Sequence, residues 1–331
     1  MDDENSSSEV GISSAGTAAG AGKAAASQIE AEALPMTVKT VVVPEMASER
    51  AEGDSVTEVD PQSCACESGT PLSYIYAIGA LRPEFPSQSM KKAFGQAEST
   101  LGVRSPADSR YAEVLSQGQY LYIAREMCWV LQIDGGIDAY IVKPRTYVEL
   151  NEIIQSIKPP TTPGEKTFTV IIGPRGPIAL PEMCNGLQLP TVICNQIYDF
   201  SENEFIKAIQ DTAKVEEDIA RSTFEQMLSL TDNAGQTDED RAINYIILRY
   251  MGLYTMASDM LDPNKPPPGV YYLRSVTAQA SRVQGTRRII DVIFHYEERD
   301  TGELVNWFCR VDVTGQFPFL VTKLSRFYPR P

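Results

Sequence analysis

The sequence predicts an α+β protein, and three observations support this fold class. Short aromatic and β-branched runs have the composition of strands, and the first is residues 73–80 (SYIYAIGA). Between residues 201 and 256 the apolar residues recur with the period of an α-helix. From Val270 onward they alternate with a period of two, as strands require. We therefore expect an N-terminal α/β lobe, a central helical pair and an antiparallel C-terminal β-meander.

Residues 1–70 differ in composition from the rest of the chain. They contain no aromatic side chain, are rich in Ala, Ser and Gly, and carry 13 acidic against three basic residues. We predict a disordered acidic tail here and a folded domain over 71–331, with lobes at 71–200 and 201–331. The tail accounts for −10 of the net charge of −15. Because the domain has no Lys/Arg-rich stripe, nucleic-acid binding is not expected.

The N-terminal lobe can be followed element by element. The first strand is expected to end at Pro83 and Pro86, after which Ser87 caps a short helix that reaches about Gln96. The further elements are a hairpin of residues 128–133 and 137–142 around Asp134-Gly135-Gly136, a helix over 147–157, and a strand over 168–173 that is buried on both faces.

The C-terminal half begins with a capping-box pattern at Ser201 and Glu204, which predicts one long helix to about Leu230. A second helix is expected to start at Thr237 and to run to about Met256. In the final meander, the pairing that places Ile290 opposite Val311 puts the apolar residues of both strands on one face. The same register sets Asp291 opposite Arg310 and His295 opposite Asn306.

The chain has no secretory signal at its start and no run of about 18 apolar residues. We therefore expect a soluble, cytoplasmic protein that does not associate with membranes. In that compartment the six cysteines would be reduced thiols rather than a disulfide framework.

The short segment Thr37–Val43 (TVKTVVV) stands out within the tail. Its residues favour a strand, so it is a candidate docking motif or added edge strand. The alternative is an isolated valine run without a role.

Few residues qualify as catalytic groups. His295 is the only histidine, so a nucleophilic triad would have to use it, but a solvent-facing strand position explains it as well. Arg175 lies in Gly173–Pro177 (GPRGP), where a stiff turn can present its guanidinium to a carboxylate or phosphate. A rigid connection without a ligand is the other interpretation of this turn.

No cofactor is expected, with zinc as the one alternative. Cys64 and Cys66 form a close pair, and a site completed by Cys184 or by a partner chain would supply thiolate ligands. Cys184 and Cys194 flank a loop and are the better candidates for exposure. Cys128 and Cys309 are expected to be core thiols.

Several long strings resemble one family. They are YIYAIGALRPEFPS (74–87), CWVL (128–131), IIGPRGPIALPEMCNGLQLP (171–190), NQIYDF (195–200), DNAGQTDEDRAINYIILRY (232–250), GTRRIIDVIFHY (285–296) and RVDVTGQFPFLVTKLSRFY (310–328). They resemble the C-terminal domain of unknown function of PatG-type cyanobactin maturation proteases. In that family the domain follows a subtilisin-like protease, which is missing from this sequence. The resemblance implies a pathway context and transfers no catalytic residue.

The leading hypothesis is a non-catalytic interaction module that works with enzymes of ribosomal peptide maturation, or with their precursor peptide. The contact surface is predicted at Arg175, at Cys184 and Asn185, and in the turn that holds Asp232, Asn233 and Asp240. The alternative is a cysteine- or metal-dependent enzyme acting on a peptide through Cys184, Arg175 and His295. Processing of the tail as a peptide, and a homodimer, are further hypotheses.

Overall fold

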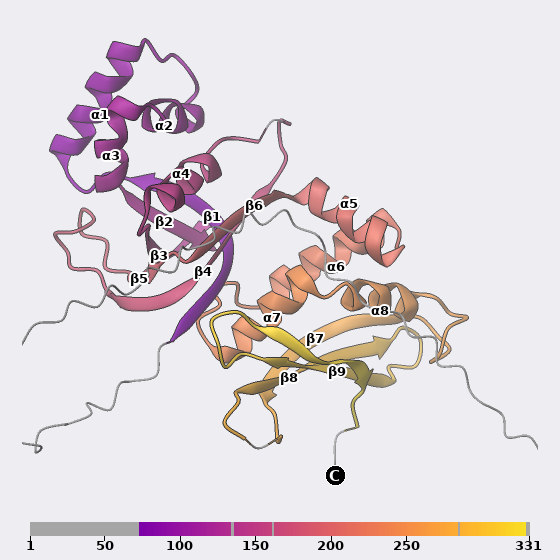
Figure 1. Ribbon diagram of the computed structural model, residues 1–331. Helices are drawn as coiled ribbons and strands as arrows, with labels where there is room; N and C mark the ends of the chain where they lie inside the picture. The colour runs from indigo at the N-terminus through magenta and orange to yellow at the C-terminus, as the bar shows by residue number, and fades with distance from the viewer. Residues whose placement is uncertain (1–72, 134–135, 161, 284, 329–331) are drawn as a thin grey trace, which may run out of the picture. The chain divides into compact units, whose positions relative to one another are not determined.

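The computed structural model describes residues 73–133, 136–160, 162–283 and 285–328, and it confirms the α+β class. Two sheets alternate with two groups of helices (Figure 1). The predicted tail lies outside the described residues. The strands of the first sheet are β1 (Tyr74–Glu84), β2 (Cys128–Ile133), β3 (Ile137–Lys143), β4 (Thr167–Ile178), β5 (Pro190–Ile193) and β6 (Gln196–Ser201).

The first sheet closes on itself through β1. Its strand order is β1-β2-β3-β5-β4-β6, and an additional pairing joins β1 to β4. Strand β1 pairs with β4 as far as Gly79 and with β2 from Ala80 onward. Five strands therefore form a ring of pairings, and β1 runs past Pro83 rather than ending before it. The predicted 128–133/137–142 hairpin is confirmed as β2 and β3.

Helices of the N-terminal half cover one face of this sheet (Figure 1). Ser87 caps the first of them, as predicted, and accepts a hydrogen bond from Met90 N. Ile75, Ala77 and Ile171 of the sheet pack into the core that these helices form. The helices are α1 (Gln88–Leu101), α2 (Ala107–Leu115), the 3₁₀ turn η1 (Gly118–Tyr120), α3 (Leu121–Glu126) and α4 (Tyr147–Ser156).

The central section has four helices where the sequence predicted two. Lys214 adopts a left-handed conformation with φ 58° and ends the first helix, and Tyr250 interrupts the second in an extended conformation. The predicted start at Thr237 is confirmed, since Thr237 and Asp240 form a capping box. The helices are α5 (Glu202–Ala213), α6 (Glu217–Leu230), α7 (Asp238–Arg249) and α8 (Gly252–Leu261).

The second sheet is the predicted C-terminal meander, in the order β10-β9-β8-β7. The register is confirmed, with Ile290 opposite Val311, Asp291 opposite Arg310 and His295 opposite Asn306. The strands are β7 (Tyr271–Ala280), β8 (Ile289–Glu298), β9 (Leu304–Asp312) and β10 (Phe319–Arg326).

The larger core lies between the two sheets and contains helices α5–α8. Val170 and Ile172 of β4 enter this core, whereas Ile171 points into the N-terminal one. The predicted burial of this strand on both faces is thus confirmed. None of the described helices is long and apolar enough to span a bilayer.

Candidate functional site

Arg175 lies within strand β4 and not on a turn, so that part of the prediction was wrong. Its backbone N–H donates to Ser73 O at 2.8 Å, and it pairs with Val192 of β5. The glycines on either side serve the close approach of β5. A Cβ on Gly173 would lie 1.8 Å from Ile193 O, and one on Gly176 would lie 2.4 Å from the Thr191 hydroxyl. The Gly-Pro-Arg-Gly string therefore fits the close pairing of β4 with β5.

The Arg175 side chain is half-buried and has no hydrogen bond or ion pair within the described part of the chain. A guanidinium has five donors in a planar fork that matches a carboxylate. This side chain is therefore available to bind an acidic group of a ligand.

The structure brings Arg175 close to the Asp232–Asp240 turn, around Tyr140. The Tyr140 hydroxyl donates to Ala234 O at 2.9 Å. Burial raises the pKa of Tyr140, the charge of Arg175 lowers it, and the charges of Asp232 and Asp240 raise it. All three charges therefore act on one buried hydroxyl. A contact surface that includes Arg175 and this turn stays a prediction.

Most residues of the Asp232–Asp240 turn form hydrogen bonds that stabilise the fold. Gly235 O accepts a hydrogen bond from Tyr76 N, and Asn233 O accepts one from Ile78 N, so the turn pairs with β1 in the manner of a short strand. The Asn233 amide donates to Leu228 O at the end of α6. Asp240 closes the capping box of α7 and is half-buried, and Asn233 is buried. Asp232 is therefore the exposed one of the three predicted contact residues.

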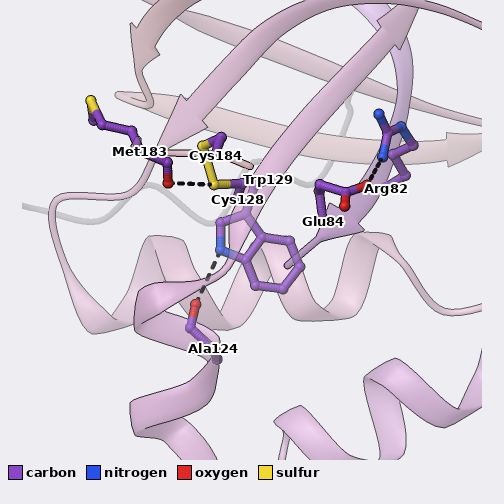
Figure 2. The surroundings of a disulfide bond; sticks show 7 residues. All are labelled: Arg82, Glu84, Ala124, Cys128, Trp129, Met183 and Cys184. Carbon is purple, nitrogen blue, oxygen red and sulfur yellow. Dashed lines mark hydrogen bonds and ion pairs between the residues drawn. A yellow bond between two sulfur atoms is a disulfide. The ribbon is translucent and has the colours of Figure 1, made fainter. Parts of the chain in front are cut away.

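Cys184 is not exposed, and it is not a thiol. It forms a disulfide with Cys128 across 56 residues, and both side chains are buried. The expectation of six reduced cysteines was therefore wrong for this pair (Figure 2). Beside it, the Trp129 indole donates to Ala124 O at 3.3 Å. The spacing of two cysteines 56 residues apart gave no sign that β2 and the loop after β4 meet.

The disulfide also bears on the predicted metal site. A sulfur engaged in a disulfide is not the thiolate that zinc requires, so Cys184 offers no ligand in this form. Cys64 and Cys66 lie outside the described residues. Within the described ranges no group of three His, Cys, Asp or Glu side chains could hold a metal ion.

The remaining described cysteines are buried and unreactive in character. Burial raises the pKa of Cys194 to about 12 and raises the pKa of Cys309 further. The core role predicted for Cys309 is confirmed, whereas the exposure predicted for Cys194 was wrong. A raised pKa keeps a thiol in the protonated form, which is a poor nucleophile.

His295 occupies the polar face of the second sheet, as the register predicted. Its Nε2 lies 2.8 Å from the Thr277 hydroxyl and its Nδ1 lies 2.8 Å from Asn306 Oδ1. These two neighbours satisfy the ring without a carboxylate. Thr277 is exposed and the group at Nδ1 is an amide rather than a carboxylate, so the arrangement is that of hydrogen-bonded side chains on the outer face of a sheet.

Sequence reasoning missed an exposed apolar surface next to Arg175. Ile178 is 62% exposed, Leu180 64%, Met183 40% and Ile193 36%. Together with Arg175 these residues form what we call the β4–β5 surface. Ile178, Leu180 and Met183 lie within six residues of the chain, closely after an arginine whose side chain has no hydrogen-bond or ion-pair partner in the part of the chain that the structure describes. Exposed apolar side chains beside an arginine have the composition of the centre of a protein interface. The sequence string GPIALPEM contains these residues but gives no information on their exposure.

The disulfide holds this surface in place. Met183 immediately precedes Cys184, and Leu180 lies four residues before it. Cys128, Ile141, Ala179 and Cys184 form a small core of their own, against which Leu187 and Leu189 of the same loop pack. The apolar side chains are therefore presented on a loop with a covalent anchor and a buried base.

Comparisons with known proteins identify the family. A family model described as "PatG Domain" matches residues 74–281, which is more than half of the chain. The chain belongs to the PatG Domain family. Among solved structures, the "PatG Domain of Unknown Function" matches with a TM-score of 0.59 at 17% identity, over 77% of this chain and 98% of that chain. At this identity the likeness concerns the fold. A search of curated proteins finds no match.

The family match confirms the resemblance stated from the sequence strings. It spans β1 to β7 and so includes Arg175, the disulfide and the Asp232–Asp240 turn. Neither of the two similar domains is described with an activity, so the comparisons assign no reaction to these residues.

Proposed function

We propose that this chain is a non-catalytic interaction module that serves ribosomal peptide maturation of the cyanobactin type. Its partner is a maturation enzyme or the precursor peptide, and its place of action is the cytoplasm. The observation that carries the proposal is the β4–β5 surface, where exposed Ile178 and Leu180 closely follow Arg175 in the chain, and the Arg175 side chain has no hydrogen-bond or ion-pair partner among the described residues. Membership of the PatG Domain family supports the pathway context.

The chemistry of the surface suggests how a partner is recognised. Apolar side chains at its centre lose contact with water on binding, which drives association. Arg175 then selects a partner with a carboxylate at a fixed distance from an apolar group. A peptide or protein segment with both features fits this surface.

The test uses the full chain, a purified subtilisin-like maturation enzyme and a precursor peptide, with affinities measured by biolayer interferometry. Leu180→Asp places a charge at the centre of the surface and should weaken binding by at least about 10-fold, as loss of an interface hot spot does. Leu304→Asp is the matched control, because Leu304 is 56% exposed on the second sheet, away from the β4–β5 residues in the chain.

Two results would count against the proposal. The first is the absence of binding to both the enzyme and the peptide. The second is equal weakening by the Leu180 and Leu304 variants, because the contact would then not lie on the β4–β5 surface. Sedimentation of the chain alone decides whether the same surface forms a homodimer, and a Leu180-dependent dimer would replace the partner by a second copy.

A further inference from the structure

A cleft of about 590 Å³ opens beside β1, at the point where that strand changes partners. Apolar side chains form much of its lining, including Ile78, Phe168, Phe224 and Leu228. Its volume lies in the range of about 300–1,000 Å³ that is usual for ligand pockets. The cleft does not involve the β4–β5 surface.

The hollow follows from the topology. Strand β1 pairs with β4 up to Gly79 opposite Thr169, and then with β2 from Ala80 opposite Gln132. The change is possible because Gly79 has no side chain, since a Cβ there would lie 2.1 Å from Gln132 O. Strands β2 and β4 thus pair with different parts of β1 and separate from each other at Gly79. Residues of α6 form another wall of the cleft.

The rim of the cleft has a small negative excess. Lys166 Nζ lies 3.8 Å from Glu202 Oε2 and 3.5 Å from Glu225 Oε1, and all three residues line the cleft. These separations exceed those of good charge-assisted hydrogen bonds. Arg221 is a second cation, 3.5 Å from Glu202 Oε1 and 3.0 Å from Glu217 Oε1. Three carboxylates against two cations favour a ligand that carries a single positive charge. Glu225 is half-exposed, so it is the carboxylate that a ligand can approach.

We propose that the cleft binds Thr37–Val43 of the same chain, with Lys39 paired to Glu225. This segment, TVKTVVV, combines four valines with one lysine, which matches an apolar cleft with a net negative rim. It is separated from Ser73 by 29 residues, which can span up to roughly 100 Å when extended. Ser73 directly precedes β1, whose Ile78–Ala80 stretch lines the cleft.

Because the segment is covalently connected to the domain, a modest affinity is enough for it to occupy the cleft. A tethered segment meets its site at an effective concentration on the order of millimolar, so a weak site is filled without a second molecule. The segment would then leave only when a competing peptide of the same chemistry arrives. The cleft is in this sense a peptide site whose resident occupant is the protein's own chain.

The experiment uses the full chain and a zero-length carbodiimide cross-linker, which joins a lysine to a carboxylate in direct contact. Mass spectrometry of the monomer band should find Lys39 joined to Glu225. Hydrogen exchange of residues 37–43 should be at least about 10-fold slower than in a synthetic peptide of the same sequence, as expected for protected amides.

Charge reversal provides the matched variants. Lys39→Glu and Glu225→Lys should each abolish the protection of residues 37–43, and the double variant should restore it. Lys23→Glu makes the same charge change elsewhere in the N-terminal stretch and should have no effect. Circular dichroism of each variant confirms that the domain is folded, so loss of protection cannot be assigned to unfolding.

Three outcomes would overturn the inference. The first is the absence of a cross-link from Lys39 to either carboxylate of the rim. The second is an equal loss of protection of residues 37–43 in Lys23→Glu. The third is a cross-link found only in dimers, which would assign the cleft to a second copy. Affinity for a maturation enzyme or precursor peptide through the β4–β5 surface is measured separately. Failure of one proposal therefore leaves the other standing.

Discussion

Gly235 holds the turn before α7 against strand β1, and its replacement by alanine tests that contact. Its φ is +59°, and a Cβ would lie 1.9 Å from Tyr76 O. The left-handed conformation alone costs an alanine about 1 kcal/mol. To relieve the clash the turn must move away and lose the bonds from Tyr76 N and Ile78 N, at about 1 to 2 kcal/mol each because these groups are buried. We therefore expect Gly235→Ala to lower the free energy of unfolding by about 3 to 5 kcal/mol.

The control is Gly102→Ala. Gly102 has a φ of +66° at the end of α1, and a Cβ there would meet no atom within 4 Å. This variant should lose only the conformational cost of about 1 kcal/mol. Urea unfolding followed by tryptophan fluorescence gives both values. If Gly235→Ala is no less stable than Gly102→Ala, the turn is not pinned to β1 as described.

Three further predictions concern sulfur and charge. Replacing Cys128 and Cys184 together by alanine should cost about 2 to 4 kcal/mol in urea unfolding, and dithiothreitol should abolish the difference from wild type; an unchanged midpoint would show that the bond does not form. The hydrogen bond from Arg82 lowers the pKa of Asp138, so this pair stabilises the fold above about pH 4 and the contribution is lost as the pH falls through the folded-state value. Asp138→Asn should thus cost about 1 kcal/mol or less at neutral pH and nothing in acid, and a cost independent of pH would contradict this. Because burial raises the pKa of Cys194 to about 12, iodoacetamide should not label it before the protein unfolds, and labelling of the native protein would refute its burial.

Periodicity was enough to predict the C-terminal sheet in detail. Shifting the β8–β9 register by one residue would put Val292 and Phe294 on the polar face, so only one pairing agrees with the pattern. The N-caps at Ser87 and Thr237 could also be predicted from the sequence. A capping side-chain oxygen lies three residues before the backbone amide that it binds, so the signal is local.

Other features depend on contacts between distant parts of the chain. The break at Lys214 interrupts an apolar pattern that continues on both sides of it, so the pattern alone predicted one helix. Arg175 was placed on a turn because its glycines resemble turn residues, while their real requirement is the close passage of β5. The division of the chain into a tail of residues 1–70 and a domain of 71–331 stays a prediction.

The predicted contact residues stay a prediction as a functional site. The Tyr140 hydroxyl bonds to Ala234 of the turn and its pKa responds to the charge of Arg175, and no local pattern in the sequence singled out this tyrosine. Exposure of Ile178 and Leu180 could not be predicted, because apolar residues next to a buried strand are expected to be buried as well. The disulfide was excluded on grounds of compartment, which is a statement about the surroundings and not about the two sulfur atoms.

Site-specific photo-cross-linking tests the central claim most directly, because it maps the contact without relying on a loss of affinity. A photoreactive phenylalanine replaces Leu180 in one protein and Leu304 in another, two positions with 64% and 56% exposure. After irradiation with the maturation enzyme and the precursor peptide, we predict a covalent adduct from position 180 and none from position 304. An adduct from position 304 alone, or from neither position under conditions where binding is detected, would contradict the assignment of the β4–β5 surface.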